Sequence, residues 1–102
     1  RMGVVGMSKT LAREVGKDNI LINVIGPGRI GTARIESLNK MRADKAGISV
    51  SDYEKEDLKK FPMARYGTID EYGRLATWLC SEANTYVSGQ TILLDGAMTT
   101  AY

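Results

Sequence analysis

The chain is poor in several residue types that many enzymes use for chemistry. Its 102 residues include no histidine, one cysteine and two prolines. Without histidine there is no obvious nucleophile–base pair, and we expect no metal site. The lone cysteine, Cys80, excludes an intrachain disulfide and favours a reducing, cytoplasmic setting. Its place on the apolar face of a predicted helix indicates an inert core residue.

Long apolar runs and one-sided charge are missing as well. No hydrophobic stretch approaches the ~20 residues that a membrane-spanning helix needs, and residues 1–5 do not have the pattern of a signal peptide. The net charge is +2, with the basic residues scattered along the chain. We therefore expect no membrane and no nucleic-acid partner. The content of 43% hydrophobic and 25% charged residues is ordinary for a small soluble domain.

The most informative segment is residues 23–32, which read Asn-Val-Ile-Gly-Pro-Gly-Arg-Ile-Gly-Thr. The almost wholly apolar run over residues 20–25 predicts a strand buried on both faces of a parallel sheet. Pro27 and Gly28 then break this strand. Open α/β sheets bind ligands beyond the carboxyl ends of their strands, so this loop is a candidate ligand site.

Two long helices and a second strand surround the loop in sequence. Apolar residues at helical spacing predict helices over residues 2–15 and 69–81, and residues 90–94 predict a second short strand. Two buried strands joined across a helix make a parallel βαβ unit, so we assign the chain to the α/β class. Two strands cannot form a stable sheet alone, and the first helix begins without a capping sequence. We therefore expect the chain to start inside an element and to lack strands that lie elsewhere.

Several residues have the form of helix caps. Gly16 is a candidate C-terminal cap for the first helix. Ser51 to Glu54 and Thr68 to Glu71 both have the form of a capping box, which predicts helices beginning at these positions.

A polar helical hairpin is expected at about residues 33–60. Its first helix carries one narrow apolar stripe, at Ile35, Leu38 and Met41. A hairpin of this kind after a ligand loop is a candidate substrate lid. The pattern alone equally allows a solvated surface excursion.

Four short segments are weak motifs when taken singly, but their order and spacing together are specific. They are residues 3–14; residues 22–24 with Pro27, Gly28 and Thr32; residues 62–67; and residues 89–92 with Asp95 and Gly96. In these segments the chain resembles the C-terminal portion of a classical short-chain dehydrogenase/reductase, most nearly of the 3-oxoacyl-carrier-protein reductase type. The resemblance implies that residues 1–102 are the C-terminal fragment of a single Rossmann-like domain, with a doubly wound parallel sheet and a helical lid insertion.

The resemblance also implies a chemistry. Members of this family pass a hydride between NAD or NADP and a carbonyl or alcohol, using a tyrosine, a lysine four residues later and a serine. The lysine position falls on Arg1, whereas the tyrosine and the serine are absent from the chain. Arginine keeps the charge but has a planar fork in place of a compact ammonium group. The alternative is that Arg1 is only a frayed terminal residue.

The resemblance assigns cofactor contacts to Pro27, Gly28, Ile30 and Thr32. The alternative for these residues is an ordinary strand-to-helix turn in which Thr32 is the N-cap. Gly96 is expected to be a turn residue. Because the residues that would read the 2′ position are not in the chain, NAD and NADP remain alternatives.

Our first functional hypothesis is that the chain is part of an NAD(P)-dependent oxidoreductase and that it is inactive when isolated. Its partners would be a small carbonyl or alcohol substrate, with an acyl chain as one option, and further copies in a dimeric or tetrameric homo-oligomer. The second hypothesis is a non-catalytic, self-associating interaction module built on the same fold, held together by the predicted helices and strand edges.

Overall fold

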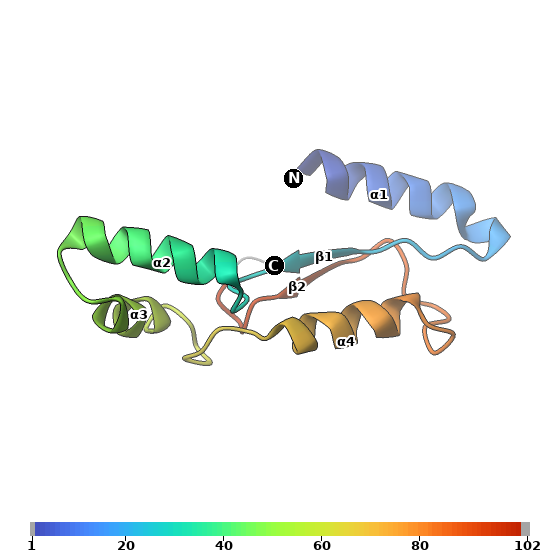
Figure 1. Ribbon diagram of the computed structural model, residues 1–102. Coiled ribbons are helices and arrows are strands. Elements are labelled where there is room, and N and C mark those ends of the chain that lie inside the picture. The colour runs from blue at the N-terminus through green and yellow to red at the C-terminus, as the bar shows by residue number, and fades with distance from the viewer. Residues whose placement is uncertain (1, 101–102) are drawn as a thin grey trace. The chain divides into compact units, whose positions relative to one another are not determined.

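The structure is a computed structural model that describes residues 2–100 (Figure 1). These residues form two compact units: unit 1 contains residues 2–26 and 73–93, and unit 2 contains residues 27–72 and 94–100. The elements, in chain order, are α1 (Met2–Val15), the 3-10 helix η1 (Gly16–Asp18), β1 (Val24–Pro27), α2 (Ala33–Ala46), α3 (Val50–Leu58), α4 (Ile69–Cys80) and β2 (Thr91–Leu94).

The strands β1 and β2 are hydrogen-bonded neighbours, which Figure 1 draws side by side. The Val24 N–H donates to the Gln90 carbonyl at 2.9 Å, and the Gly28 N–H donates to the Leu94 carbonyl at 2.8 Å. The sequence offset between donor and acceptor is the same in both bonds, as in a parallel pair. The predicted α/β class with a parallel sheet is therefore confirmed.

The first strand begins later than predicted. We expected it over residues 20–25, but β1 starts at Val24 and most of its residues are half-buried rather than buried on both faces. The cause lies just upstream, where the Ser88 hydroxyl accepts from the Ile22 N–H at 2.9 Å. A side chain thus replaces a strand partner, and this part of the apolar run forms an extended loop.

In unit 1, α1 contacts the turn that leads into β2. Ala12 is buried, with 6% of its surface exposed, and Lys9 Nζ donates to the Gly89 carbonyl at 3.0 Å. The helix ends at Val15 as predicted, but Gly16 is not its left-handed cap. The chain continues into η1, and Asn19 takes the left-handed conformation at φ 59°, which asparagine tolerates better than most residues.

The apolar stripe of α1 is not covered by the described residues. Val4, Met7 and Leu11 keep 52%, 64% and 42% of their surface exposed. The prediction for Cys80 was also wrong, since this residue is exposed in the described chain. Its neighbour Leu79 is the buried residue of α4.

In unit 2, α2 and α3 form the expected helical hairpin (Figure 1). Gly47 ends α2 in the left-handed conformation at φ 70°. The cap of α3 is Ser49, whose side chain accepts from the Asp52 N–H, so the capping box predicted at Ser51 is wrong. Both serines have an acidic residue three positions later; Ser49 is the one that directly follows the turn after α2.

The predicted capping box at the start of α4 is confirmed. Thr68 Oγ1 accepts from the Glu71 N–H at 3.0 Å, and Glu71 Oε1 accepts from the Thr68 N–H at 3.0 Å. This reciprocal pair satisfies two of the N–H groups that a helix start leaves without partners.

Candidate functional site

The loop after β1, residues 28–32, is anchored by backbone hydrogen bonds on two sides. The Gly28 N–H donates to the Leu94 carbonyl of β2 at 2.8 Å. On the other side, the Gly31 N–H donates to the Gly67 carbonyl at 2.8 Å, and the Gly67 N–H donates to the Arg29 carbonyl at 2.9 Å. Ile30 and Gly67 thereby form a short parallel bridge. These backbone hydrogen bonds fix the loop within unit 2.

An added Cβ would make a close contact at two glycines of this arrangement, and at Gly28 the contact includes backbone. A Cβ added at Gly28 would lie 2.7 Å from Asp95 Cβ and 2.8 Å from Asp95 Cα. A Cβ added at Gly67 would lie 2.9 Å from Ile30 Cδ1. The close approach of backbones therefore explains Gly28 of the Pro-Gly motif without reference to a ligand.

Thr32 fulfils its alternative role and keeps a free donor. Its Oγ1 accepts from the Ile35 N–H at 3.4 Å, which makes it the N-cap of α2. In this bond the hydroxyl oxygen is the acceptor, so the hydroxyl proton can still be donated to another group. Among the described residues, the backbone N–H groups of Ile30 and Thr32 also find no acceptor. The loop thus offers several donors to a ligand rich in acceptor atoms, such as a carboxamide or a phosphate.

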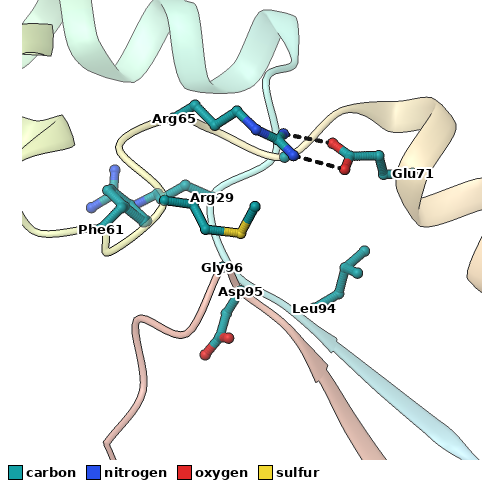
Figure 2. Close-up of a pocket in the computed structure, with 9 residues that line it drawn as sticks. Arg29, Phe61, Arg65, Glu71, Leu94, Asp95 and Gly96 are labelled. Atoms are coloured by element: carbon teal, nitrogen blue, oxygen red, sulfur yellow. Dashed lines mark hydrogen bonds and ion pairs between the residues drawn. The ribbon is translucent and has the colours of Figure 1, made fainter.

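A small pocket of about 90 Å³ lies beside this loop in unit 2 (Figure 2). None of the four predicted cofactor residues lines it, although their neighbour Arg29 does. The lining residues are Arg29, Phe61, Met63, Arg65, Gly67, Glu71, Leu94, Asp95 and Gly96.

Three of the charged groups around the pocket have close partners, namely Arg65, Glu71 and Asp95. Arg65 makes a two-pronged ion pair with Glu71, at 2.7 and 3.0 Å, which Figure 2 shows at one side of the pocket. The guanidinium of Arg65, with the capping bond from Thr68, lowers the pKa of Glu71 to about 2. Hydrogen bonds from Thr99 lower the pKa of Asp95. Asp95 directly precedes Gly96, which has a φ of 61° in the turn that follows β2. The expected turn role of Gly96 agrees with this geometry.

A buried polar cluster that the sequence did not reveal lies next to the loop. Its centre is Asp57 of α3, whose side chain has no exposed surface. The Tyr66 hydroxyl donates to Asp57 Oδ2 at 2.7 Å and accepts from Asn39 Nδ2 at 3.1 Å. Arg29 Nη1 lies 3.6 Å from the same carboxylate oxygen, and Lys60 Nζ lies 3.6 Å from Oδ1.

Burial and this carboxylate raise the pKa of Tyr66 to about 12. The phenol is therefore protonated at neutral pH and acts as a hydrogen-bond donor to Asp57. It is not suited to abstract a proton. In this cluster Tyr66 therefore has a structural role.

The stripe predicted for the substrate lid lies on α2, away from the fully buried face of that helix. Asn39 and Ala43 have 0% exposure, whereas Ile35 and Leu38 are half-buried and Met41 is 50% exposed. The stripe is therefore partly open to solvent. Arg1, the predicted catalytic position, lies outside the described residues.

Two classes of site find no support in residues 2–100. None of the described helices combines the length and the apolar character needed to cross a bilayer. Nor does this part of the chain bring three or more histidine, cysteine, aspartate or glutamate side chains together in a way that could hold a metal ion.

Comparison with known proteins adds independent information. Residues 1–99 match the family model described as enoyl-(acyl carrier protein) reductase. The 3-oxoacyl-[acyl-carrier-protein] reductase FabG of Chlamydia trachomatis is 36% identical over 98 residues, which are 96% of this chain and 35% of that protein.

Solved structures with the same fold include a short chain dehydrogenase family protein from Francisella tularensis. It has a TM-score of 0.90 and 29% identity, and the match covers 97% of this chain and 41% of that one. The L-sorbose reductase of Gluconobacter frateurii, complexed with NADPH and L-sorbose, has a TM-score of 0.88 and 32% identity over 99% of this chain and 39% of its own. The chain thus spans well under half the length of these proteins.

Proposed function

This chain belongs to the short-chain dehydrogenase/reductase family, and we propose that it forms part of an NAD(P)-dependent oxidoreductase acting on a carbonyl or alcohol. The reductases among its relatives support this activity. The L-sorbose reductase, crystallised with NADPH, supports the cofactor class. We further propose that the enzyme works in a reducing, cytoplasmic setting, as a dimer or tetramer.

The observation that carries the proposal is the loop after β1. It leaves the N–H groups of Ile30 and Thr32 and the Thr32 hydroxyl proton available, at the carboxyl end of a parallel strand. These donors fit the carboxamide and phosphate oxygens of a nicotinamide dinucleotide. We assign Ile30 and Thr32 to direct contacts, and Pro27 and Gly28 to shaping the loop.

When bound, the nicotinamide would supply or accept the hydride. The described residues would bind and orient its end of the dinucleotide, because the loop after β1 offers fixed donors. Arg1 occupies the family's lysine position, where its charge could contact the ribose. Since neither the catalytic tyrosine nor a glycine-rich phosphate loop occurs in residues 1–102, we expect these residues alone to show no turnover.

For the substrate, the relatives point to different molecules, so we propose only the carbonyl or alcohol class. The half-open stripe of Ile35, Leu38 and Met41 would suit an apolar or acyl part of the substrate. We propose the hairpin of α2 and α3 as a substrate lid.

The test is a fluorescence titration of the complete gene product with NADH and NADPH, comparing Thr32 variants that separate capping from binding. Thr32→Asp retains a good N-cap but places a negative charge beside the dinucleotide phosphates, so affinity should fall at least about tenfold without loss of thermal stability. Thr32→Ser keeps both the cap and the donor, and should bind like the parent.

Ser49→Ala is the matched control, because it removes the N-cap of the neighbouring helix without touching the loop. It should lower the melting temperature and leave dinucleotide affinity unchanged. Failure of the parent protein to bind either dinucleotide would refute the proposed function. Equal affinity for Thr32→Asp and the parent would refute the role of the loop.

One observation favours the second candidate, a self-associating module. The stripe of Val4, Met7 and Leu11 on α1 is exposed in the described chain, and a helix face of this kind requires a cover in water. Sedimentation of residues 1–102 at several concentrations tests this. A stable dimer that Met7→Lys dissociates, together with no dinucleotide binding by the complete gene product, would favour the interaction module over the enzyme.

A further inference from the structure

The buried carboxylate of Asp57 meets side chains from both sides of the bridge that fixes the ligand loop. Arg29 belongs to the loop, and its carbonyl accepts from the Gly67 N–H at 2.9 Å. Tyr66 directly precedes Gly67 in the opposing segment. The side chains of both residues converge on Asp57 Oδ2, at 3.6 Å from Arg29 Nη1 and 2.7 Å from the Tyr66 hydroxyl.

We propose that Asp57 is a positioning residue that clamps the loop of residues 28–32 against residues 66–67. Through Arg29 and Tyr66, it would fix the direction of the free donors at Ile30 and Thr32. The inference rests on the proposed function only for what these donors bind. The clamp itself is a property of unit 2 and can be measured without a ligand.

Electrostatics explains why a carboxylate suits this position. The Arg29 side chain is only 25% exposed and the Asp57 side chain is fully buried, so each charge has lost most of its water. A buried charge without a partner is costly, whereas a paired one is held in place. Lys60 also lies 3.6 Å from Asp57, but its side chain is 68% exposed and can be solvated without the pair. The position of Arg29 therefore depends on the charge of Asp57 more than the position of Lys60 does.

The hydrogen-bonding inventory leads to the same conclusion. Arg29 Nη1, Asp57 Oδ1 and Asn39 Oδ1 are buried and form no hydrogen bond within residues 2–100. At 3.6 Å, the contact of Arg29 with Asp57 is an ion pair rather than a hydrogen bond. The position of Arg29 thus depends on charge, so a neutral amide of the same shape should not replace the carboxylate.

The experiment compares Asp57→Asn with Glu56→Gln in the complete gene product. Glu56 is the preceding residue on α3, but its side chain is 68% exposed and pairs with Lys59 on the surface. Hydrogen exchange at the Gly31 and Gly67 amides reports the clamp directly, because both form the backbone bonds of the bridge. We expect exchange at these amides to speed up about tenfold or more in Asp57→Asn and to stay unchanged in Glu56→Gln.

Enzyme kinetics separates a positioning role of Asp57 from a purely structural one, because only a positioning role should change KM for the dinucleotide selectively. Asp57→Asn should raise the KM for the dinucleotide about fivefold with little change in kcat, since Asp57 orients the binding loop and does not touch reacting atoms. Arg29→Gln should give the same result. The double variant should be no worse than either single variant, because both changes break one clamp.

Several results would overturn the proposal. One is unchanged exchange at Gly31 and Gly67 in Asp57→Asn; another is equal acceleration throughout α2 and α3, which would indicate general loss of stability. Local acceleration with an unchanged KM would show that the clamp does not set the ligand-facing geometry. If Asp57→Asn fails to fold, Arg29→Gln decides by the same criteria. If the parent binds no dinucleotide, the proposed function fails, and the exchange data alone decide the clamp.

Discussion

Gly28→Ala is expected to destabilise the protein through a backbone collision. The new Cβ would lie 2.7 Å from Asp95 Cβ and 2.8 Å from Asp95 Cα, so side-chain rotation cannot relieve the contact. Either the loop or the end of β2 must move, which also weakens the 2.8 Å bond from the Gly28 N–H to the Leu94 carbonyl.

The magnitude follows from these terms. Overpacking of this kind costs about 1–3 kcal/mol, and a weakened hydrogen bond adds about 0.5–1.5 kcal/mol. The lower entropy of the unfolded chain with alanine returns about 0.4–1 kcal/mol. These ranges combine to a net loss of about 0.5–4 kcal/mol. Each kcal/mol lowers the melting temperature by roughly 4–8 °C if the cooperative unit has about 100 residues.

The assay is thermal unfolding followed by circular dichroism, with Gly26→Ala as the matched control. A Cβ at Gly26 would lie 2.8 Å from Leu93 Cδ2, the mobile end of a side chain that is 49% exposed. Leu93 can rotate away, so we expect this variant to lose well under the amount lost by Gly28→Ala. A Gly28→Ala protein as stable as the parent, or less affected than Gly26→Ala, would refute the collision argument.

Three further predictions concern polar contacts. Tyr66→Phe should cost about 1–3 kcal/mol by chemical denaturation, since it leaves the buried Asp57 without its closest donor. The pKa of Tyr66 is raised from 10.0 to about 12, so the stability that the Tyr66 hydroxyl adds is fully present below pH 10 and is lost as the pH rises through 12. Tyr66→Phe should therefore lose less stability than the parent as the pH is raised. For Glu71, a pKa lowered from 4.5 to about 2 means that its contribution to stability is present above pH 4.5 and is lost as the pH falls towards 2. Glu71→Gln should therefore lower the melting temperature at neutral pH and flatten this acid dependence, whereas Glu56→Gln should leave the melting temperature at neutral pH unchanged. Asn84→Ala should cost about 1–3 kcal/mol in the same denaturation assay, because the 5% exposed Asn84 bonds the Leu79 carbonyl and both polar groups of Val87; an unchanged midpoint would contradict its structural role.

Two predictions based on local signals were accurate. The bounds of α1 match the apolar periodicity, and α4 begins where Thr68 and Glu71 form their capping box. Both signals depend only on residues within one or two turns of each other. The capping box predicted at Ser51 was wrong for a related reason. Ser49 also has an acidic residue three positions later, and only the end of α2 at Gly47 decides which serine caps α3.

Predictions that depend on distant contacts were less accurate. The apolar run before β1 has the composition of a buried strand, but Ser88, from a turn far along the chain, binds Ile22 and takes the place of a strand partner. Cys80 lies at an apolar position of its helical pattern and is nevertheless exposed, because burial depends on which face the neighbouring segments cover. Composition and periodicity contain neither piece of information.

In the candidate site, too, the local feature could be predicted from sequence and the distant contacts could not. The loop could be located from sequence because Pro27 and Gly28 mark the end of a strand, and strand ends are where α/β sheets bind ligands. What holds the loop could not be predicted, because Arg29 and Asp57 lie on different elements and follow no common period. An aspartate on a short polar helix is ordinarily solvated, and only the folded structure shows that Asp57 is fully buried. A fully buried carboxylate must be paired, and both Tyr66 and Arg29 come from the bridge that fixes the loop. The sequence therefore reveals the loop after Pro27 and Gly28, but it does not reveal Asp57, the buried carboxylate on which we propose that the geometry of this loop depends.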